Sequence, residues 1–123
     1  MPIIEFYKII NLTSEDKGIN AIIKLNPNHD IYKGHFSEQA VVPGVIQLQI
    51  VKEIMENHLE KKLFMGSISQ VKYLIPITPL ENPELSIAIT LKNDETGNIK
   101  TNVLISFGDA VFTKAKITFS IAK

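Results

Sequence analysis

The stretch GVIQLQIVKEIMENHLEK, residues 44–61, decides the fold class of this chain. Its apolar residues recur at intervals of three and four, and no proline interrupts them, which predicts an α-helix. Projected at 100° per residue, the apolar residues cover a broad arc, and the charged residues with Gln49 fill the narrower remainder. Pro43, directly ahead, is typical of a helix start. We therefore predict a long helix that is buried on most of its circumference, as if a sheet were wrapped around it.

Segments on both sides of this helix alternate apolar and polar residues with period two, which predicts half-buried strands. The predicted strands are one before the helix and four after it: 19–25, then about 68–75, 87–91, 103–107 and 111–121. In the last strand the alternation places Phe112 on the polar face. Turn-forming residues separate the strands at 14–18, 94–98 and 108–109, and the last turn is short enough for a tight antiparallel hairpin. One dominant helix with a meandering antiparallel sheet is an α+β layout.

Length and composition set the frame for function. A chain of 123 residues is large enough for one core and too short for two, so we expect a single domain over residues 1–123. Thirteen basic residues balance thirteen acidic ones, so no long-range field favours nucleic acid or a membrane. The chain has no cysteine, which excludes disulfides and a cysteine nucleophile. Without a signal-like start or an apolar run of about 20 residues, the expected location is the cytoplasm.

The segment between the first strand and the helix carries a recognisable motif. It reads Asp30-Ile31-Tyr32-Lys33-Gly34-His35-Phe36, then Val41-Val42-Pro43-Gly44-Val45-Ile46. This motif resembles the active-site signature of the (3R)-hydroxyacyl-[acyl carrier protein] dehydratases, in which Gly-His-Phe is followed by a Pro-Gly-Val helix start. The segment from Val71 to Pro79 is similar to the family's strand and turn before its final hairpins. The resemblance covers nearly the whole chain and implies a hotdog fold, an antiparallel sheet wrapped around one long central helix.

The chemistry of dehydration suits two residues of this motif. The reaction removes a proton next to a thioester carbonyl and expels hydroxide. A neutral imidazole at His35 is a suitable base because its unperturbed pKa, about 6.5, lies near working pH. The thioester oxygen gains charge, and the free backbone N–H groups of a helix that begins at Gly44 would stabilise it. We therefore predict His35 as the base and Gly44 as the oxyanion donor.

The family resemblance adds further expectations about the site and its partners. It implies substrate contacts at Phe36, Val41, Pro43 and Val45, with the Val41 carbonyl orienting the histidine. It implies a substrate delivered on acyl carrier protein, an acidic partner, and a dimer with two pockets at its interface, with larger assemblies in some relatives. A local basic patch would meet that partner, for which the candidates are Lys33, Lys61, Lys62 and Lys72. No cofactor is implied, and no two histidines have metal-ligand spacing with carboxylates.

Gln49 departs from the family pattern, which has Glu or Asp at this position as a catalytic acid that projects toward a histidine of the partner subunit. A carboxylic acid can protonate the departing hydroxyl, whereas a carboxamide can only hydrogen-bond to it. Loss of a general acid typically costs on the order of 10²–10⁴ in rate. Glu53, one helical turn later, and Glu38, in a loop that also departs from the family, are the candidates to replace it. Gln49 is therefore a predicted site residue whose chemistry is altered.

Three functions follow from these residues. The first is an active dehydratase, a lyase of fatty acid or related acyl synthesis such as that of a polyene pigment, in which His35 does most of the work and Gln49 positions the hydroxyl or a water. The second is a catalytically weak or silent acyl-binding subunit that pairs with a carboxylate-bearing homologue as a heterodimer and lends it His35. The third is an acyl thioesterase, because other hotdog proteins hydrolyse acyl thioesters, although no residue of the sequence points to it.

Overall fold

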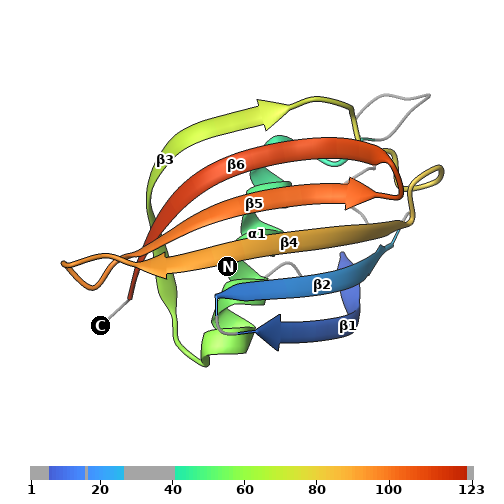
Figure 1. Ribbon diagram of the computed structural model, residues 1–123. Helices are drawn as coiled ribbons and strands as arrows, with labels where there is room; N and C mark the ends of the chain where they lie inside the picture. The colour runs from blue at the N-terminus through green and yellow to red at the C-terminus, as the bar shows by residue number, and fades with distance from the viewer. Residues whose placement is uncertain (1–5, 16, 27–40, 122–123) are drawn as a thin grey trace.

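The computed structural model describes residues 6–15, 17–26 and 41–121, and within them lie one helix and six strands (Figure 1). In chain order these elements are β1 (Tyr7–Glu15), β2 (Gly18–Leu25), α1 (Gly44–Leu59), β3 (Leu63–Tyr73), β4 (Glu84–Asn93), β5 (Ile99–Phe107) and β6 (Ala110–Ile121). The strands form one sheet in the order β1-β2-β4-β5-β6-β3, with every neighbouring pair antiparallel. The predicted α+β class is confirmed.

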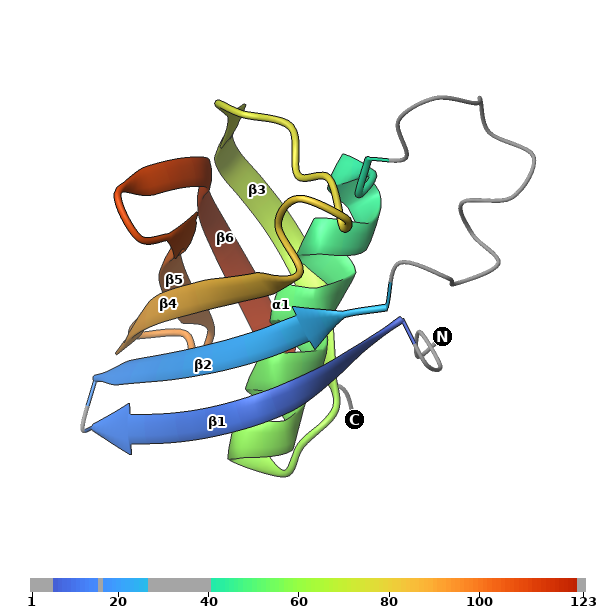
Figure 2. The same cartoon turned by 90° about the vertical axis from the view of Figure 1, so that its right-hand side faces the viewer.

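The sheet curves around α1, which lies along its inner face (Figure 2). The long helix and the alternating strands make this possible, since period-two strands place every second side chain on the helix side. This arrangement is the predicted hotdog fold. No helix among the described residues is long and apolar enough to cross a membrane.

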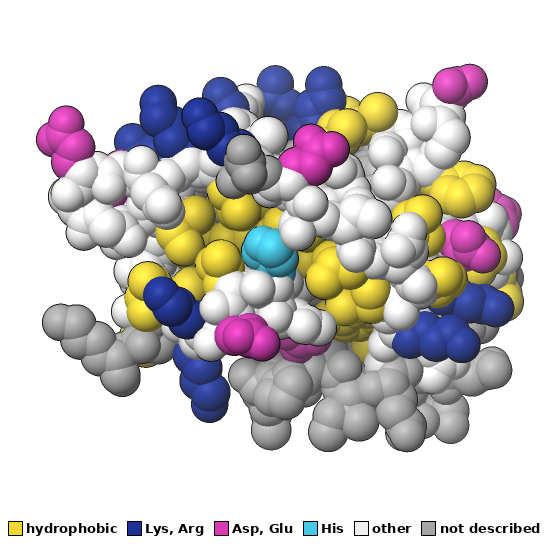
Figure 3. All heavy atoms as spheres, turned by 60° about the horizontal axis from the view of Figure 1, so that its bottom comes forward, with side chains coloured by type: hydrophobic (Ala, Val, Ile, Leu, Met, Phe, Trp, Pro, Cys, Tyr) yellow, Lys and Arg dark blue, Asp and Glu magenta, His cyan; other side chains and the backbone are white. Residues whose placement is uncertain are grey.

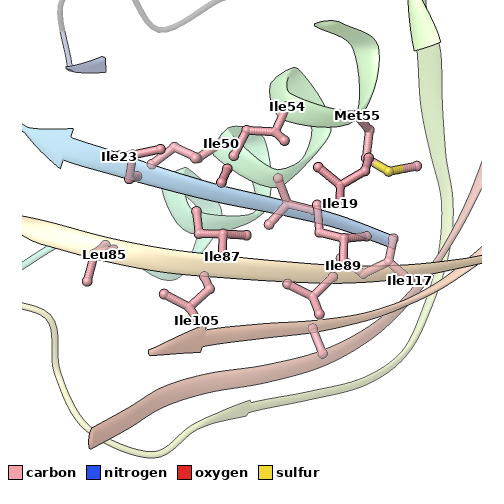
Figure 4. Close-up of a cluster of buried hydrophobic side chains, with 14 of the residues drawn as sticks. Ile19, Ile23, Ile50, Ile54, Met55, Leu85, Ile87, Ile89, Ile105 and Ile117 are labelled. Carbon is pink, nitrogen blue, oxygen red and sulfur yellow. The ribbon is translucent and has the colours of Figure 1, made fainter. Parts of the chain in front are cut away.

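The core fills the space between α1 and the inner face of the sheet (Figure 4). Four residues of α1 are almost fully buried: Ile50, Val51, Ile54 and Met55. Across the sheet the register places Ile19, Ile89 and Val103 side by side on the inner face. Burying a side chain of this size stabilises the fold by about 1.5–3 kcal/mol before entropy is counted. The predicted apolar arc of the helix is thus the face that packs on the sheet.

β1 is a strand that the sequence did not predict. It lies at the edge of the sheet, and a register shift between Ile9 and Asn11 breaks the alternation on which the prediction depended. Ser14 and Glu15, predicted as turn residues, are the end of this strand. An edge strand with a bulge has no clean period of two, which explains why its residues went unrecognised.

Two further predictions about the sheet were wrong in detail. β3 runs from Leu63 to Tyr73, so it begins earlier than predicted, and it pairs with β6 at the far edge of the sheet instead of extending a simple meander. Phe112 is buried, not on the polar face, because it is the extra residue of a bulge between the pairs Ile105↔Thr113 and Ser106↔Val111. A single extra residue shifts the face of its neighbours, and this shift is invisible in the alternation alone.

Candidate active site

The start of α1 presents free backbone donors. Pro43 is the N-cap residue, with extended backbone angles, and its carbonyl accepts from the N–H groups of Ile46 and Gln47 at 3.1 Å. The N–H groups of Gly44 and Val45 have no acceptor among the described residues. The side chain of Val45 is 71% exposed, so this end of the helix is open on one side. Free N–H groups and the positive end of a helix together favour a negatively charged oxygen.

Tyr73 borders this helix start. It is the last residue of β3, on the inner face of the sheet, and its ring lies against the backbone of Gly44. Burial raises the pKa of the Tyr73 hydroxyl, which is therefore protonated and a hydrogen-bond donor at neutral pH. Sequence reasoning did not single out Tyr73. It does fall within the segment from Val71 to Pro79 for which a family resemblance was noted.

A buried polar contact fixes the first turn of α1 to the sheet. The hydroxyl of Thr113, on β6, donates to Gln47 Oε1 at 2.5 Å, and Gln47 Nε2 donates to the carbonyl of Val42 at 3.3 Å. Gln47 is 5% exposed and Thr113 is 1% exposed. Thr113 also pairs directly with Tyr73 in the sheet register. One strand pair thus holds both the Gln47 anchor and the tyrosine beside Gly44.

The segment before the helix is held from a second side as well. The N–H of Val42 donates to the carbonyl of Ile77 at 2.8 Å, and the Val42 side chain is buried. Sequence reasoning missed Gln47. The available signal was its place within the apolar arc of the helix, because a glutamine that is buried there must find hydrogen-bond partners. The result is a helix start whose position is fixed by side-chain and backbone bonds together.

Gln49 belongs to a hydrogen-bonded chain of three side chains. Its Nε2 donates to Glu53 Oε2 at 3.1 Å, and the Tyr7 hydroxyl donates to Glu53 Oε1 at 2.9 Å. All three side chains are half-buried. Burial first, and then the hydrogen bond and charge of Glu53, raise the pKa of Tyr7 well above its ordinary value. Tyr7 therefore keeps its proton and acts as a donor.

The predicted site residues have different outcomes. His35 and Phe36, with Lys33 and Glu38, lie outside the described residues. The structure brings together Val41, Pro43, Gly44 and Val45 at the helix start. Gln49 lies five residues further along α1, about 7.5 Å along the helix axis.

Lysines line the outer face of the sheet, the face turned away from α1. Direct cross-strand pairs join Lys72 to Lys114 and Lys92 to Lys100. In Figure 3 this face lies along the upper edge, where lysine side chains gather. Of the predicted patch, Lys72 belongs to this face. Lys62 precedes the opposite end of β3, on the order of 30 Å away along the strand.

A groove of about 1030 Å³ crosses the outer face of the sheet. Its lining includes Asn20, Thr90, Asn102 and Lys116 and none of the residues at the start of α1. The groove and the helix start are therefore separate features on opposite faces of the sheet.

Among the described residues no group of three or more histidine or acidic side chains is arranged to hold a metal ion.

Comparison with known sequences gives a family match and several relatives. The model of the ApeI-like family, described as ApeI dehydratase, matches residues 11–108. The chain is 25% identical over 125 residues to the 3-hydroxyacyl-[acyl-carrier-protein] dehydratase FabZ of Fusobacterium nucleatum, a match that covers 94% of this chain and 84% of the relative. Its match to the FabZ of Wolinella succinogenes is 29% identical over 85 residues and covers 58% of this chain and 56% of that relative.

Comparison with solved structures shows the same fold. One similar structure is a chain of the dehydratase heterocomplex ApeI:P from Xenorhabdus doucetiae, with a TM-score of 0.65, 22% identity and 97% of each chain covered. Another is the putative thioesterase yhdA from Lactococcus lactis, with a TM-score of 0.65, 12% identity, and 96% of this chain and 93% of that chain covered. At these identities the likeness concerns the fold alone.

Proposed function

This chain belongs to the ApeI-like dehydratase family, and on that premise we propose that it eliminates water from (3R)-3-hydroxyacyl thioesters to give trans-2-enoyl thioesters. The observation that carries the proposal is the start of α1, where the N–H groups of Gly44 and Val45 are free among the described residues and the protonated hydroxyl of Tyr73 lies beside Gly44. Donors held in place by Gln47 and Thr113 are what a developing oxyanion requires. The FabZ relatives support the same reaction class.

In the proposed mechanism His35 is the base. Its imidazole takes the proton from C2 of the substrate, and the charge that develops on the thioester oxygen is stabilised by the N–H of Gly44. The C3–O bond then breaks, and the leaving hydroxide needs a proton to depart as water. The carboxamide of Gln49 has no acidic proton to give. The imidazolium formed at His35 therefore returns the proton to the leaving group, which balances the step.

The surroundings of the helix start suit an acyl substrate on a carrier protein. Phe36, Val41, Pro43 and Val45 are the proposed contacts for the acyl thioester, with the Val41 carbonyl orienting His35. Lys72 adjoins Tyr73 at the end of β3, so of the described patch candidates it is the one next to a residue of the helix start, and its charge favours an acidic partner such as acyl carrier protein. The proposed setting is the cytoplasm, in fatty acid synthesis or the synthesis of a related acyl product such as a polyene, by a single domain over residues 1–123.

We also propose that the working form is a dimer. β3 is an edge strand, so one side of its backbone has no strand partner among the described residues. It also exposes the apolar side chains of Phe64 and Ile68. A second copy, or a homologue, that covers this edge would complete the pocket from the other side, as the family resemblance implies.

The proposal is tested by incubating purified protein with a (3R)-3-hydroxyacyl thioester and following enoyl absorbance. The matched variants are His35→Ala and His58→Ala, since His58 lies near the other end of α1. We expect turnover in the parent and in His58→Ala, and a loss on the order of 10²–10⁴ in His35→Ala. No enoyl product from the pure protein would contradict the proposal. Release of free thiol from acyl-CoA in its place would identify the thioesterase alternative.

A second candidate function is a silent subunit that lends His35 to a carboxylate-bearing homologue. The observation that favours it is Gln49, which has no acid to contribute and donates to Glu53. A neighbour in the same fold is a dehydratase heterocomplex. This candidate predicts that Gln49→Glu gains turnover when the parent alone has none, or that a homologue co-purifies and restores it. If neither happens, the candidate is abandoned.

A further inference from the structure

The hydrogen bonds around Gln49 define which atom of its amide meets Glu53 and which is turned away. We infer that Glu53, supported by Tyr7, is a positioning residue that turns the carbonyl oxygen of Gln49 toward the 3-hydroxyl group of the substrate. This inference rests on the proposed function, because it assumes that Gln49 contacts the bound substrate. It assigns to Glu53 and Tyr7 a role in selecting hydroxyacyl over unsubstituted acyl chains.

The chemistry of the contact fixes the direction of the amide. A carboxylate has only acceptor atoms, so the group of Gln49 that meets Glu53 Oε2 at 3.1 Å must be its NH₂. The carbonyl oxygen Oε1 is bonded to the same carbon and is therefore turned away from Glu53. Glutamine can ordinarily present either atom to a ligand, but here the neighbouring charge removes that choice.

Glu53 is itself held in place. It lies four residues after Gln49, a spacing at which side chains on one helix face meet. Its second oxygen accepts from the Tyr7 hydroxyl at 2.9 Å, which ties the helix side chain to the start of β1, 46 residues away. Tyr7 is protonated at neutral pH, so its hydroxyl remains the donor in this hydrogen bond. The orientation of Gln49 thus depends on two elements of the fold and not on a single rotamer.

The consequence for recognition follows from the direction of the hydrogen bond. A 3-hydroxyl group donates its hydrogen to Gln49 Oε1, which leaves lone pairs on the hydroxyl oxygen free to accept the proton that departs with it. An acyl chain without the hydroxyl leaves Oε1 unpaired, and an unpaired acceptor in a substrate pocket lowers affinity. Gln49 then selects the substrate without acting as an acid.

The experiment compares the binding of two probes by calorimetry: amide-linked analogues of 3-hydroxyacyl-pantetheine and of the same acyl-pantetheine without the hydroxyl. We expect the parent to prefer the hydroxylated probe by about five-fold, the worth of one neutral hydrogen bond. Gln49→Ala and Glu53→Gln should bring the ratio near one, and Tyr7→Phe should reduce it. Glu60→Gln, the same change at an exposed position just after α1, should keep the parent ratio.

The outcomes separate the inference from the proposed function. If Glu53→Gln keeps the preference while Gln49→Ala loses it, Glu53 does not orient the amide and the inference is overturned. If the parent turns over substrate but has no preference, the inference fails and the proposed function stands. If the parent neither binds the probes nor forms enoyl product, the proposed function has failed. Should Glu53→Gln prove unfolded by circular dichroism, Tyr7→Phe decides, because it removes the hydrogen bond that holds Glu53 in place. A parent-like preference in Tyr7→Phe overturns the inference.

Discussion

The ring of Tyr73 lies so close to Gly44 that a Cβ built on Gly44 would come within 2.5 Å of the ring carbon Cζ and the hydroxyl oxygen. Only glycine allows the tyrosine to occupy this place beside the free N–H groups of α1. The contact explains why this position in the motif needs glycine for packing as well as for the approach of a substrate.

Gly44→Ala should therefore displace Tyr73 or strain the start of α1. Overpacking of this kind typically costs about 1–3 kcal/mol in the free energy of unfolding. Because the clashing atoms are the far end of one side chain, Tyr73→Ala in the same chain should remove most of that cost. Urea unfolding of the two single variants and the double variant measures the coupling. An equal cost of Gly44→Ala with and without the Tyr73 ring would contradict the packing argument.

Thr113→Val should destabilise the protein although it keeps the shape of the side chain. The change leaves Gln47 Oε1 buried without its donor, which typically costs about 1–3 kcal/mol. Thr113→Ser keeps the hydroxyl and is the matched control, with a smaller expected loss. Chemical denaturation provides the comparison. Equal stability of the valine variant and the parent would mean that the contact with Gln47 contributes nothing.

Tyr7 predicts how stability changes at alkaline pH. Its pKa is raised in the folded chain, while in the unfolded chain it lies near 10. The stabilisation that comes with this proton is fully present below about pH 10. It is lost as pH rises from there through the folded pKa, because over this range the unfolded state has released the proton and the folded state has not. The free energy of unfolding, measured from pH 8 to 11, should fall more steeply with pH in the parent than in Tyr7→Phe. The lysine titrations are common to both proteins, so parallel curves would refute the prediction.

Most of the fold could be predicted from the sequence because the helix and most of the strands show a regular local period. The helix from Gly44 and the strands β2, β4, β5 and β6 each show a regular period over enough residues to be read. β1 and the burial of Phe112 could not be predicted, since both depend on bulges that interrupt the period. The partner of β3 is likewise a matter of tertiary packing, which alternation does not encode.

The candidate site could likewise be predicted from the sequence only in part. The role of Gly44 could be predicted from its place after Pro43, because a helix start has free donors whatever its surroundings. The contacts of Tyr73 with Gly44 and of Gln47 with Thr113 join residues 29 and 66 positions apart in the chain, for which a single sequence contains no signal of proximity. Gln49 was expected to be altered chemically, and only the structure connects it with Glu53 and Tyr7.

The most direct test of the central claim is where a substrate analogue binds, measured by backbone amide shifts during titration with the amide-linked analogue of 3-hydroxyacyl-pantetheine. The account predicts that the N–H signals of Gly44 and Val45 move most, because they meet the carbonyl oxygen that takes the place of the thioester oxygen. Changes confined to Asn20, Thr90 and Asn102 in the outer groove, with Gly44 and Val45 unmoved, would contradict it.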